Sequence, residues 1–418
     1  MSLPFQNRNN ASKDLLTPRW RSRDELHKQQ LQEQVLSKGL RRAPPRRPTV
    51  GEFTGLCLLI AFPDVPAAVT RDEVDAFCNR PGYDGFGNNG SVFDYFHEVS
   101  GGRLSYRTVV APLYTAAHPL GHYTDTTLPF AQRARELILE AIAFHRANGF
   151  DFSALTVDAQ RGVYAMNVLY AGEVPNEWGF GLWPHASRLA APVPLAARKS
   201  ALDYQITAMG RELTLGVYCH ENGHMLCDFP DLYDYADSAK GVGRYCLMCL
   251  GSYHPTTNPT RVSAYLRYRA GWGEAVPLTA GRFTAAAAQP DRFFIHRRDA
   301  TEYFILENRH AAGRDAGLRS SGLAIWHIDE LGSNAEPAKA PNGHRHFECV
   351  LLQADGLAEL QQGLDAGDRN DLFGALRRPL FSDGTPVSSQ WWDGTPSRLQ
   401  IRSIEANGDD LSFTVELA

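Results

Sequence analysis

The stretch that decides the fold and the chemistry is Thr214–Asp234, TLGVYCHENGHMLCDFPDLYD. Within it His220 and His224 stand four residues apart, with Glu221 directly after the first. Residues four apart on a helix share a face, so both imidazoles can reach a single metal ion. The alternative is a helix with two unrelated surface histidines. The apolar residues before His220 argue against that alternative because they indicate a buried helix.

This spacing predicts a zinc-dependent endopeptidase. Neutral imidazoles of His220 and His224 hold Zn²⁺, and the ion lowers the pKa of a bound water towards about 7. Glu221 takes a proton from this water as general base and passes it to the leaving amine as general acid. Glu221 is not a ligand, so its presence argues against an inactive metal-binding surface or adhesion protein. A zinc amidase acting on a non-protein substrate stays open as an alternative.

A zinc protease also needs a third protein ligand. The candidates within reach are Asp228, Asp231 and Asp234. A continuing helix would carry Asp228 onto the face of His224. Pro230 argues that the helix ends before it, which favours a ligand after a turn, Asp231 or Asp234.

The segment HENGHMLCDFPDLYD resembles the zinc-binding segment of the immune inhibitor A (M6) family of secreted bacterial metallopeptidases, H-E-x-G-H-x-x-G-x-P-D-x-Y-D. Further stretches resemble the same family in the same order: SVFDYFHEVSGGRLSY (91–106), LWPHA (182–186), GVGRYCLMCLGSY (241–253), AYLRYRAGW (264–272), EYFILENR (302–309) and GLAIWHID (322–329). The resemblance implies a metzincin-like catalytic domain and secretion. It also implies Asp231 as third zinc ligand, with Asp228 as the rival, and Met248 in a turn beneath the metal.

The chain departs from this family pattern in two ways. Cys227 stands where the family has Gly, and one extra residue precedes Pro-Asp. Glycine tolerates a positive φ and allows a sharp reversal. A cysteine there must turn differently or let the helix run on.

Four further residues are candidates for the cleft. Tyr253 and His254 follow the Met248 turn and could donate to the oxyanion of a tetrahedral intermediate, although structural packing explains Tyr253 equally well. His327 and Asp329 point to one face of a strand by period two. With the resemblance, both His327 and Asp329 can contribute to the cleft wall, and a satisfied buried histidine is the default alternative for His327.

An oxygen-rich loop, DAGDRND, is a candidate calcium site. Calcium prefers oxygen ligands, and the loop offers them at Asp365, Asp368, Asn370 and Asp371. Its spacing does not match an EF-hand, so a solvated turn is the alternative.

The seven cysteines do not form a structural zinc site by their spacing. Cys246 and Cys249 form a single CxxC without a second pair. A disulfide from Cys227 to one of these two is a hypothesis, and buried thiols are the alternative.

Composition narrows the class of protein. The chain has 418 residues with a net charge of −5, and hydrophobic residues make up 43%. This suggests two or three domains, and the charge gives no reason to expect nucleic acid as a partner. The longest apolar run, residues 55–62, is far short of the roughly 20 residues that span a membrane. We therefore expect no nucleic-acid partner and no membrane span. The endopeptidase interpretation predicts a protein or peptide substrate, and we expect a monomer.

The first 50 residues form a basic arm with 11 Lys and Arg against 4 Asp and Glu, which leaves −12 for the rest. The arm ends in a Pro-rich stretch, residues 41–48, that favours an extended linker. It shows no apolar run typical of a secretory signal. A solvated tail is one interpretation, and a pro-segment that docks on the acidic body is the other.

The pattern of the remaining chain predicts an α+β fold. Strands are expected at 55–62, 103–112 and 164–170, and helices at 91–100 and 131–148. After about 275 short β-prone segments dominate, at 292–296, 303–307, 323–328, 348–352 and 411–416. We therefore expect a catalytic domain over 51–275, with a twisted sheet and the zinc helix, followed by a β-rich domain over 276–418.

Overall fold

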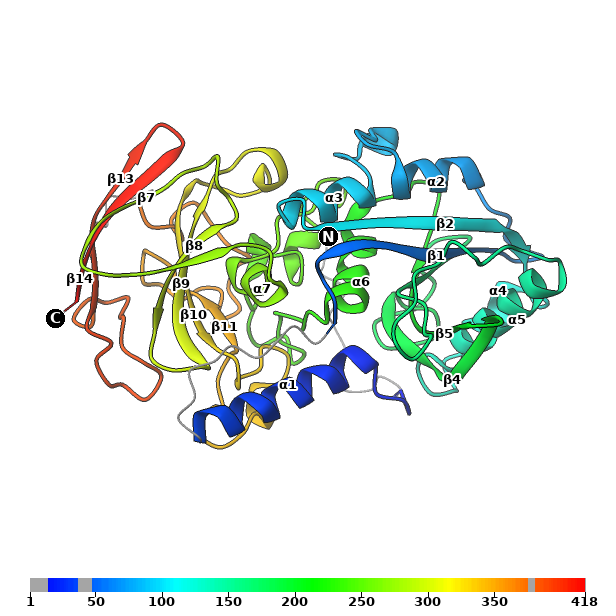
Figure 1. Cartoon of the computed structure of the whole chain (residues 1–418), viewed down its shortest axis with the longest axis horizontal. Coiled ribbons are helices and arrows are strands. Elements are labelled where there is room, and N and C mark those ends of the chain that lie inside the picture. The colour runs from blue at the N-terminus through cyan, green and yellow to red at the C-terminus, as the bar shows by residue number, and fades with distance from the viewer. Residues whose placement is uncertain (1–13, 37–46, 375–379, 418) are drawn as a thin grey trace. The chain divides into compact units, whose positions relative to one another are not determined.

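The computed structural model describes residues 14–36, 47–374 and 380–417 (Figure 1). These residues form a mixed α and β protein with seven α-helices and three sheets. They divide into two compact units: the first takes the residues up to Asp24, Arg47–Glu98 and Gly102–Pro230, and the second takes the rest. The units therefore divide before Asp231, whereas the expected domain boundary at 275 stays a prediction.

The first unit is built on a five-stranded sheet with the order β2-β1-β3-β5-β4. Its strands are β1 (Gly51–Ala61), β2 (Leu104–Thr115), β3 (Met166–Tyr170), β4 (His185–Ala196) and β5 (Lys199–Ala208). Strand β1 pairs in parallel with β2, which lies beside it in Figure 1, and with β3. The three expected strands are confirmed as β1, β2 and β3. The antiparallel β4–β5 pair was not predicted. Strand β4 contains Pro192 and Pro194, which it tolerates because it lies at the edge of the sheet.

The helices of this unit follow their sequence signals. They are α2 (Arg71–Asn79), α3 (Val92–Val99), α4 (Leu120–Tyr123), α5 (Gln132–Ala147) and α6 (Leu215–Cys227). Both expected helices are confirmed as α3 and α5, and the buried face of α5 has the predicted 3–4 spacing. The Ser91 hydroxyl accepts the Asp94 N–H at 3.1 Å and so caps α3. Helix α6 packs against β4 and β5, which fixes it to the sheet.

The second unit contains two sheets and helix α7 (Ala264–Ala270). One sheet has the order β11-β10-β9-β8-β6 and the other β12-β13-β14-β7. Their strands are β6 (Glu274–Pro277), β7 (Gly281–Ala285), β8 (Arg292–Arg297), β9 (Glu302–Arg309), β10 (Gly322–Asp329), β11 (Cys349–Leu351), β12 (Leu380–Phe381), β13 (Leu399–Asn407) and β14 (Asp410–Leu417). The five expected strands correspond to β8, β9, β10, β11 and β14. A shared apolar core, rich in phenylalanine, includes residues of both sheets.

Helix α1 (Arg19–Leu36) lies in the basic arm, its first residues in the first unit and the remainder in the second. Most of the Pro-rich stretch, including Arg42, falls outside the described residues. None of the helices in the described parts of the chain has the length and apolar character that a membrane crossing requires.

Candidate metal centre

Helix α6 presents the His220-Glu221-x-x-His224 pattern in a buried environment. It begins after Thr214 and ends at Cys227, and every residue in it except Val217 is buried. The rings of His220 and His224 lie with centroids 4.9 Å apart, as expected for residues one turn apart. Glu221 is buried as well, with 7% of its surface exposed. Two unrelated surface histidines therefore do not describe this helix.

The end of α6 orients the second histidine. Asp228 caps the helix in the left-handed conformation, with φ at 54°, so the chain reverses and the Phe229 N–H bonds to the Gly223 carbonyl at 3.3 Å. The Phe229 carbonyl then lies 2.6 Å from Nδ1 of His224. A proton on Nδ1 donated to this carbonyl leaves the lone pair on Nε2, as in most metal-ligating histidines.

The same turn accounts for the missing glycine. The helix runs on through Cys227, and the positive φ falls one residue later, on Asp228. Aspartate enters the left-handed region more readily than most residues because its short side chain can bond locally. The extra residue before Pro230 therefore moves the reversal by one position.

Asp231 is the carboxylate that the structure brings to the two histidines. One ligand atom each from His220, His224 and Asp231 lie within 4.8 Å of one another, and all three residues are buried. The Tyr235 hydroxyl donates to Oδ2 of Asp231 at 2.6 Å and orients the carboxylate. Two imidazoles and one carboxylate suit Zn²⁺.

Asp228, the rival ligand, is engaged elsewhere. Nε of Arg23 lies 2.8 Å from each of its oxygens, and Nη2 lies 2.5 Å from Oδ1. Burial raises the pKa of Asp228, and the Arg23 guanidinium acts in the opposite direction. Asp228 therefore has a different partner in the structure, and Asp231 as third ligand stays a prediction.

Arg23 belongs to a set of arm residues that dock on the first unit. Trp20 is 8% exposed and stacks on the ring of His224, with centroids 4.3 Å apart and planes at 17°. Nitrogens of Arg19, Arg23 and Arg47 lie 3.4–3.5 Å from Oδ2 of Asp203. The described part of the arm is therefore not a solvated tail: it covers one face of a candidate ligand.

Little in the sequence indicated these contacts. The charge excess of the basic arm predicts attraction to the acidic remainder of the chain but does not select a partner residue. Nothing in the sequence indicated Trp20 as part of the site. Only its burial against His224 identifies it as part of the site.

The other cleft candidates lie in the second unit. Met248 is fully buried, and its carbonyl accepts the Leu232 N–H at 2.8 Å. Burial lowers the pKa of His254, and Tyr253 is partly exposed. His327 is a buried histidine whose Nε2 lies 3.1 Å from Oε1 of Glu302. The default interpretation of His327, a satisfied core histidine, thus has a named partner.

The oxygen-rich loop DAGDRND supplies only two of the four carboxylates of an acidic cluster. Asp368 and Asp371 gather with Asp355 and Glu359, whereas the carboxylate of the expected Asp365 is not in this group. Burial and the neighbouring carboxylates raise the pKa of Glu359. Asp355 and Glu359 were missed because they precede the first residue of the loop, Asp365, by ten and six positions in the chain. Calcium binding stays a prediction.

All seven cysteines are buried and none forms a disulfide. The hypothesis of a bond from Cys227 to Cys246 or Cys249 is therefore not supported. Burial raises the pKa of Cys227, Cys246 and Cys249, which keeps them as thiols.

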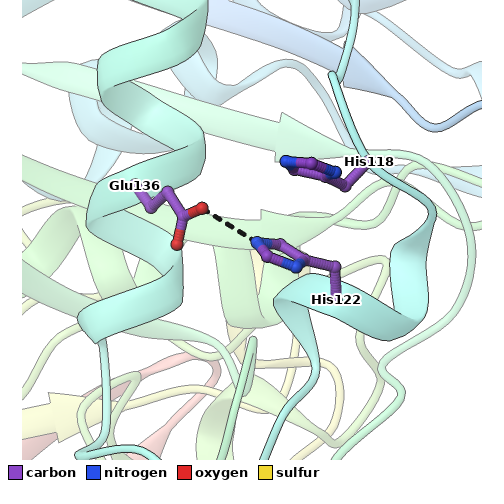
Figure 2. Close-up of side chains that lie close together, drawn as sticks. All are labelled: His118, His122 and Glu136. Carbon is purple, nitrogen blue, oxygen red and sulfur yellow. Dashed lines mark hydrogen bonds and ion pairs between the residues drawn. The ribbon is translucent and has the colours of Figure 1, made fainter.

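A separate group on the first unit consists of His118, His122 and Glu136 (Figure 2). Nε2 of His122, on α4, lies 2.8 Å from Oε1 of Glu136, on α5. Arg133 also reaches this group, with Nη1 2.9 Å from Nε2 of His122 and 2.6 Å from Oε2 of Glu136. A cation already neutralises the carboxylate, so this cluster is a surface ion-pair network.

Comparison with known families agrees with the resemblance. Residues 191–275 match the catalytic domain of the immune inhibitor A peptidases, family M6. The segment includes all of α6 and the Met248 turn. The match confirms the resemblance to the M6 metallopeptidases and supports a peptidase that acts on protein and uses a metal ion. Among curated proteins, none matches this chain.

Proposed function

Because residues 191–275 match the M6 catalytic domain, we propose that the protein is a zinc-dependent endopeptidase. The observation that carries the proposal is the pair of buried histidines on one face of α6, with Nδ1 of His224 held by the Phe229 carbonyl. This hydrogen bond directs Nε2 towards a ligand and selects the tautomer that binds metal. His220, His224 and Asp231 are the proposed zinc ligands.

The division of labour follows from the residue types. Zinc bound there supplies Lewis-acid polarisation of the scissile carbonyl and a lower pKa for the attacking water. The Glu221 carboxylate accepts a proton from this water as it attacks and delivers it to the leaving amine nitrogen. Glu221 is buried, which keeps its carboxylate from competing solvent. Tyr253, His254 and Met248 stay predicted contributors to the oxyanion site and the turn.

The test is cleavage of denatured casein by the full chain and by Glu221→Gln. The variant keeps the size of the side chain but removes the base, so the rate should fall on the order of 10²–10⁴-fold. Glu212→Gln is the matched control, because Glu212 is exposed just before α6. A chelator should abolish cleavage and added zinc should restore it. Cleavage that survives both the chelator and Glu221→Gln refutes the mechanism.

We further propose that the basic arm restrains this site as a pro-segment. Two contacts of the arm support this proposal. Trp20 stacks on His224 of the zinc helix, and Arg23 pairs with Asp228, the residue that ends this helix. Secretion and a monomeric state belong to the same proposal and rest on the resemblance and the composition.

A further inference from the structure

A second cluster of ligand-type side chains lies in the second unit, outside the proposed zinc helix. Asp329 ends β10, and His344 and His346 come from the segment before β11. Their ligand atoms lie within 4.8 Å of one another. We propose that these three residues bind a divalent transition-metal ion of the zinc class. This site goes beyond the proposed peptidase centre and does not depend on it.

The carboxylate of the cluster is buried and fixed. The Asp329 side chain is 2% exposed. Its Oδ1 accepts the Leu331 N–H at 3.0 Å, and its own N–H donates to the Glu348 carbonyl at 2.9 Å. Rotation of the carboxylate would break the first bond, so Oδ2 stays directed at the histidines. A buried carboxylate needs compensation by donors or a metal.

Both histidines direct a ring nitrogen at this one oxygen. Nδ1 of His344 lies 2.6 Å and Nε2 of His346 lies 2.7 Å from Oδ2 of Asp329. The His346 ring stacks on Trp392 with centroids 4.2 Å apart and planes at 12°. The rings therefore converge through different nitrogens, and at least one of them is held by packing.

The backbone keeps the histidine segment against the end of β10. The Ser333 N–H donates to the His346 carbonyl at 3.0 Å. A Cβ on Gly332 would lie 2.9 Å from the His346 carbonyl oxygen and from the Glu348 nitrogen. Only glycine permits this close approach. The hydrogen bond from Ser333 and the close contact at Gly332 therefore both hold the backbone of His346 near the end of β10.

The donor set selects the kind of ion. Two imidazoles and one carboxylate suit Zn²⁺ and similar transition metals, whereas Ca²⁺ takes oxygen ligands. The histidine side chains are 29% and 17% exposed, so water can complete the coordination. Without an ion, a proton lies between each of these two ring nitrogens and Oδ2 of Asp329. When both rings are neutral and present their lone pairs, the ion takes the place of these two protons. The carboxylate of the His118 group, by contrast, is already paired with Arg133.

The test is zinc stoichiometry of the full chain in a Glu221→Gln background, which prevents self-cleavage. After dialysis against buffered zinc, elemental analysis should find two zinc ions per chain. His344→Ala and His346→Ala should each lower this number by one. His310→Ala is the matched control, because His310 also lies beside an aspartate, Asp409, but belongs to no such cluster. It should keep two ions.

A fourth variant separates this site from the peptidase centre. His224→Ala should also lose one ion, and the ion that stays should be lost when His346→Ala is added. Thermal melts of each variant show whether the chain is folded, and His344→Gln replaces His344→Ala if that variant is not folded. If the folded His344 and His346 variants hold as much zinc as their parent, the inference is wrong, whatever His224→Ala does.

Discussion

Removal of the Arg23 guanidinium should activate the peptidase. Arg23 lies on α1 of the basic arm and forms a two-pronged ion pair with Asp228, directly after α6. The two side chains are 17% and 2% exposed, so solvent screens the pair little. Because Trp20 on the same helix covers His224, undocking of the arm uncovers the proposed site. Arg23→Ala should therefore favour the undocked, active form.

The size of the effect follows from the lost hydrogen bonds. Hydrogen bonds to a charged partner contribute about 1.5–3 kcal/mol. Since each ~1.4 kcal/mol is a factor of ten, the ratio of docked to undocked chains should fall by about 10–150-fold. Where the docked form predominates, the cleavage rate rises by the same factor.

The assay is the initial rate of cleavage of a quenched fluorescent peptide by the full chain. Arg23→Lys keeps the charge but loses the fork geometry, so it should activate less than Arg23→Ala. Asp228→Asn removes the other charge and tolerates the left-handed turn, so it should activate too. The double variant should be no more active than the better single one, because both act on one pair. Gln29→Ala, exposed on the same helix, is the control.

The reasoning fails if Arg23→Ala and Asp228→Asn both cleave at the wild-type rate while tryptophan fluorescence reports that Trp20 has left its stack. Docking would then not limit access to the site. Activation by Gln29→Ala to the same extent would also refute the specific role of the ion pair.

Three other perturbations test the site and the fold. Asp231→Ala should lose the zinc of the α6 site in equilibrium dialysis, whereas Asp228→Asn should retain it; equal retention by both would reject Asp231 as ligand. Burial lowers the pKa of His185 to about 4. As the pH falls below about 6.5, His185 is therefore protonated in the unfolded chain before it is protonated in the folded chain. Stability should therefore drop by about 2 kcal/mol between pH 7 and pH 5 in urea unfolding, and His185→Gln should remove this part of the dependence. Arg267 and Glu307 form a fully buried ion pair in the second unit. Glu307→Gln strands the guanidinium and should cost about 3–5 kcal/mol of unfolding free energy; a loss below about 1 kcal/mol would show that the pair is not buried in solution.

Local patterns in the sequence predicted the helices and strands on which the candidate site lies. The 3–4 spacing of apolar residues predicted α5, and the spacing of His220 and His224 predicted a ligand-bearing helix. These signals are reliable because helix geometry places residues four apart on one face whatever surrounds them. The proline before Asp231 likewise indicated that the helix ends early, and it ends at Cys227.

Contacts between distant segments could not be predicted in this way. The sequence offered Asp228, Asp231 and Asp234 alike, and only the left-handed turn at Asp228 directs one carboxylate to Arg23 and another to the histidines. The convergence of His344 and His346 on Asp329 likewise depends on how a loop packs against a strand end. Helix and strand periodicity is a local property of the backbone, whereas the direction of a side chain after a turn is set by the packing of residues far away in the chain.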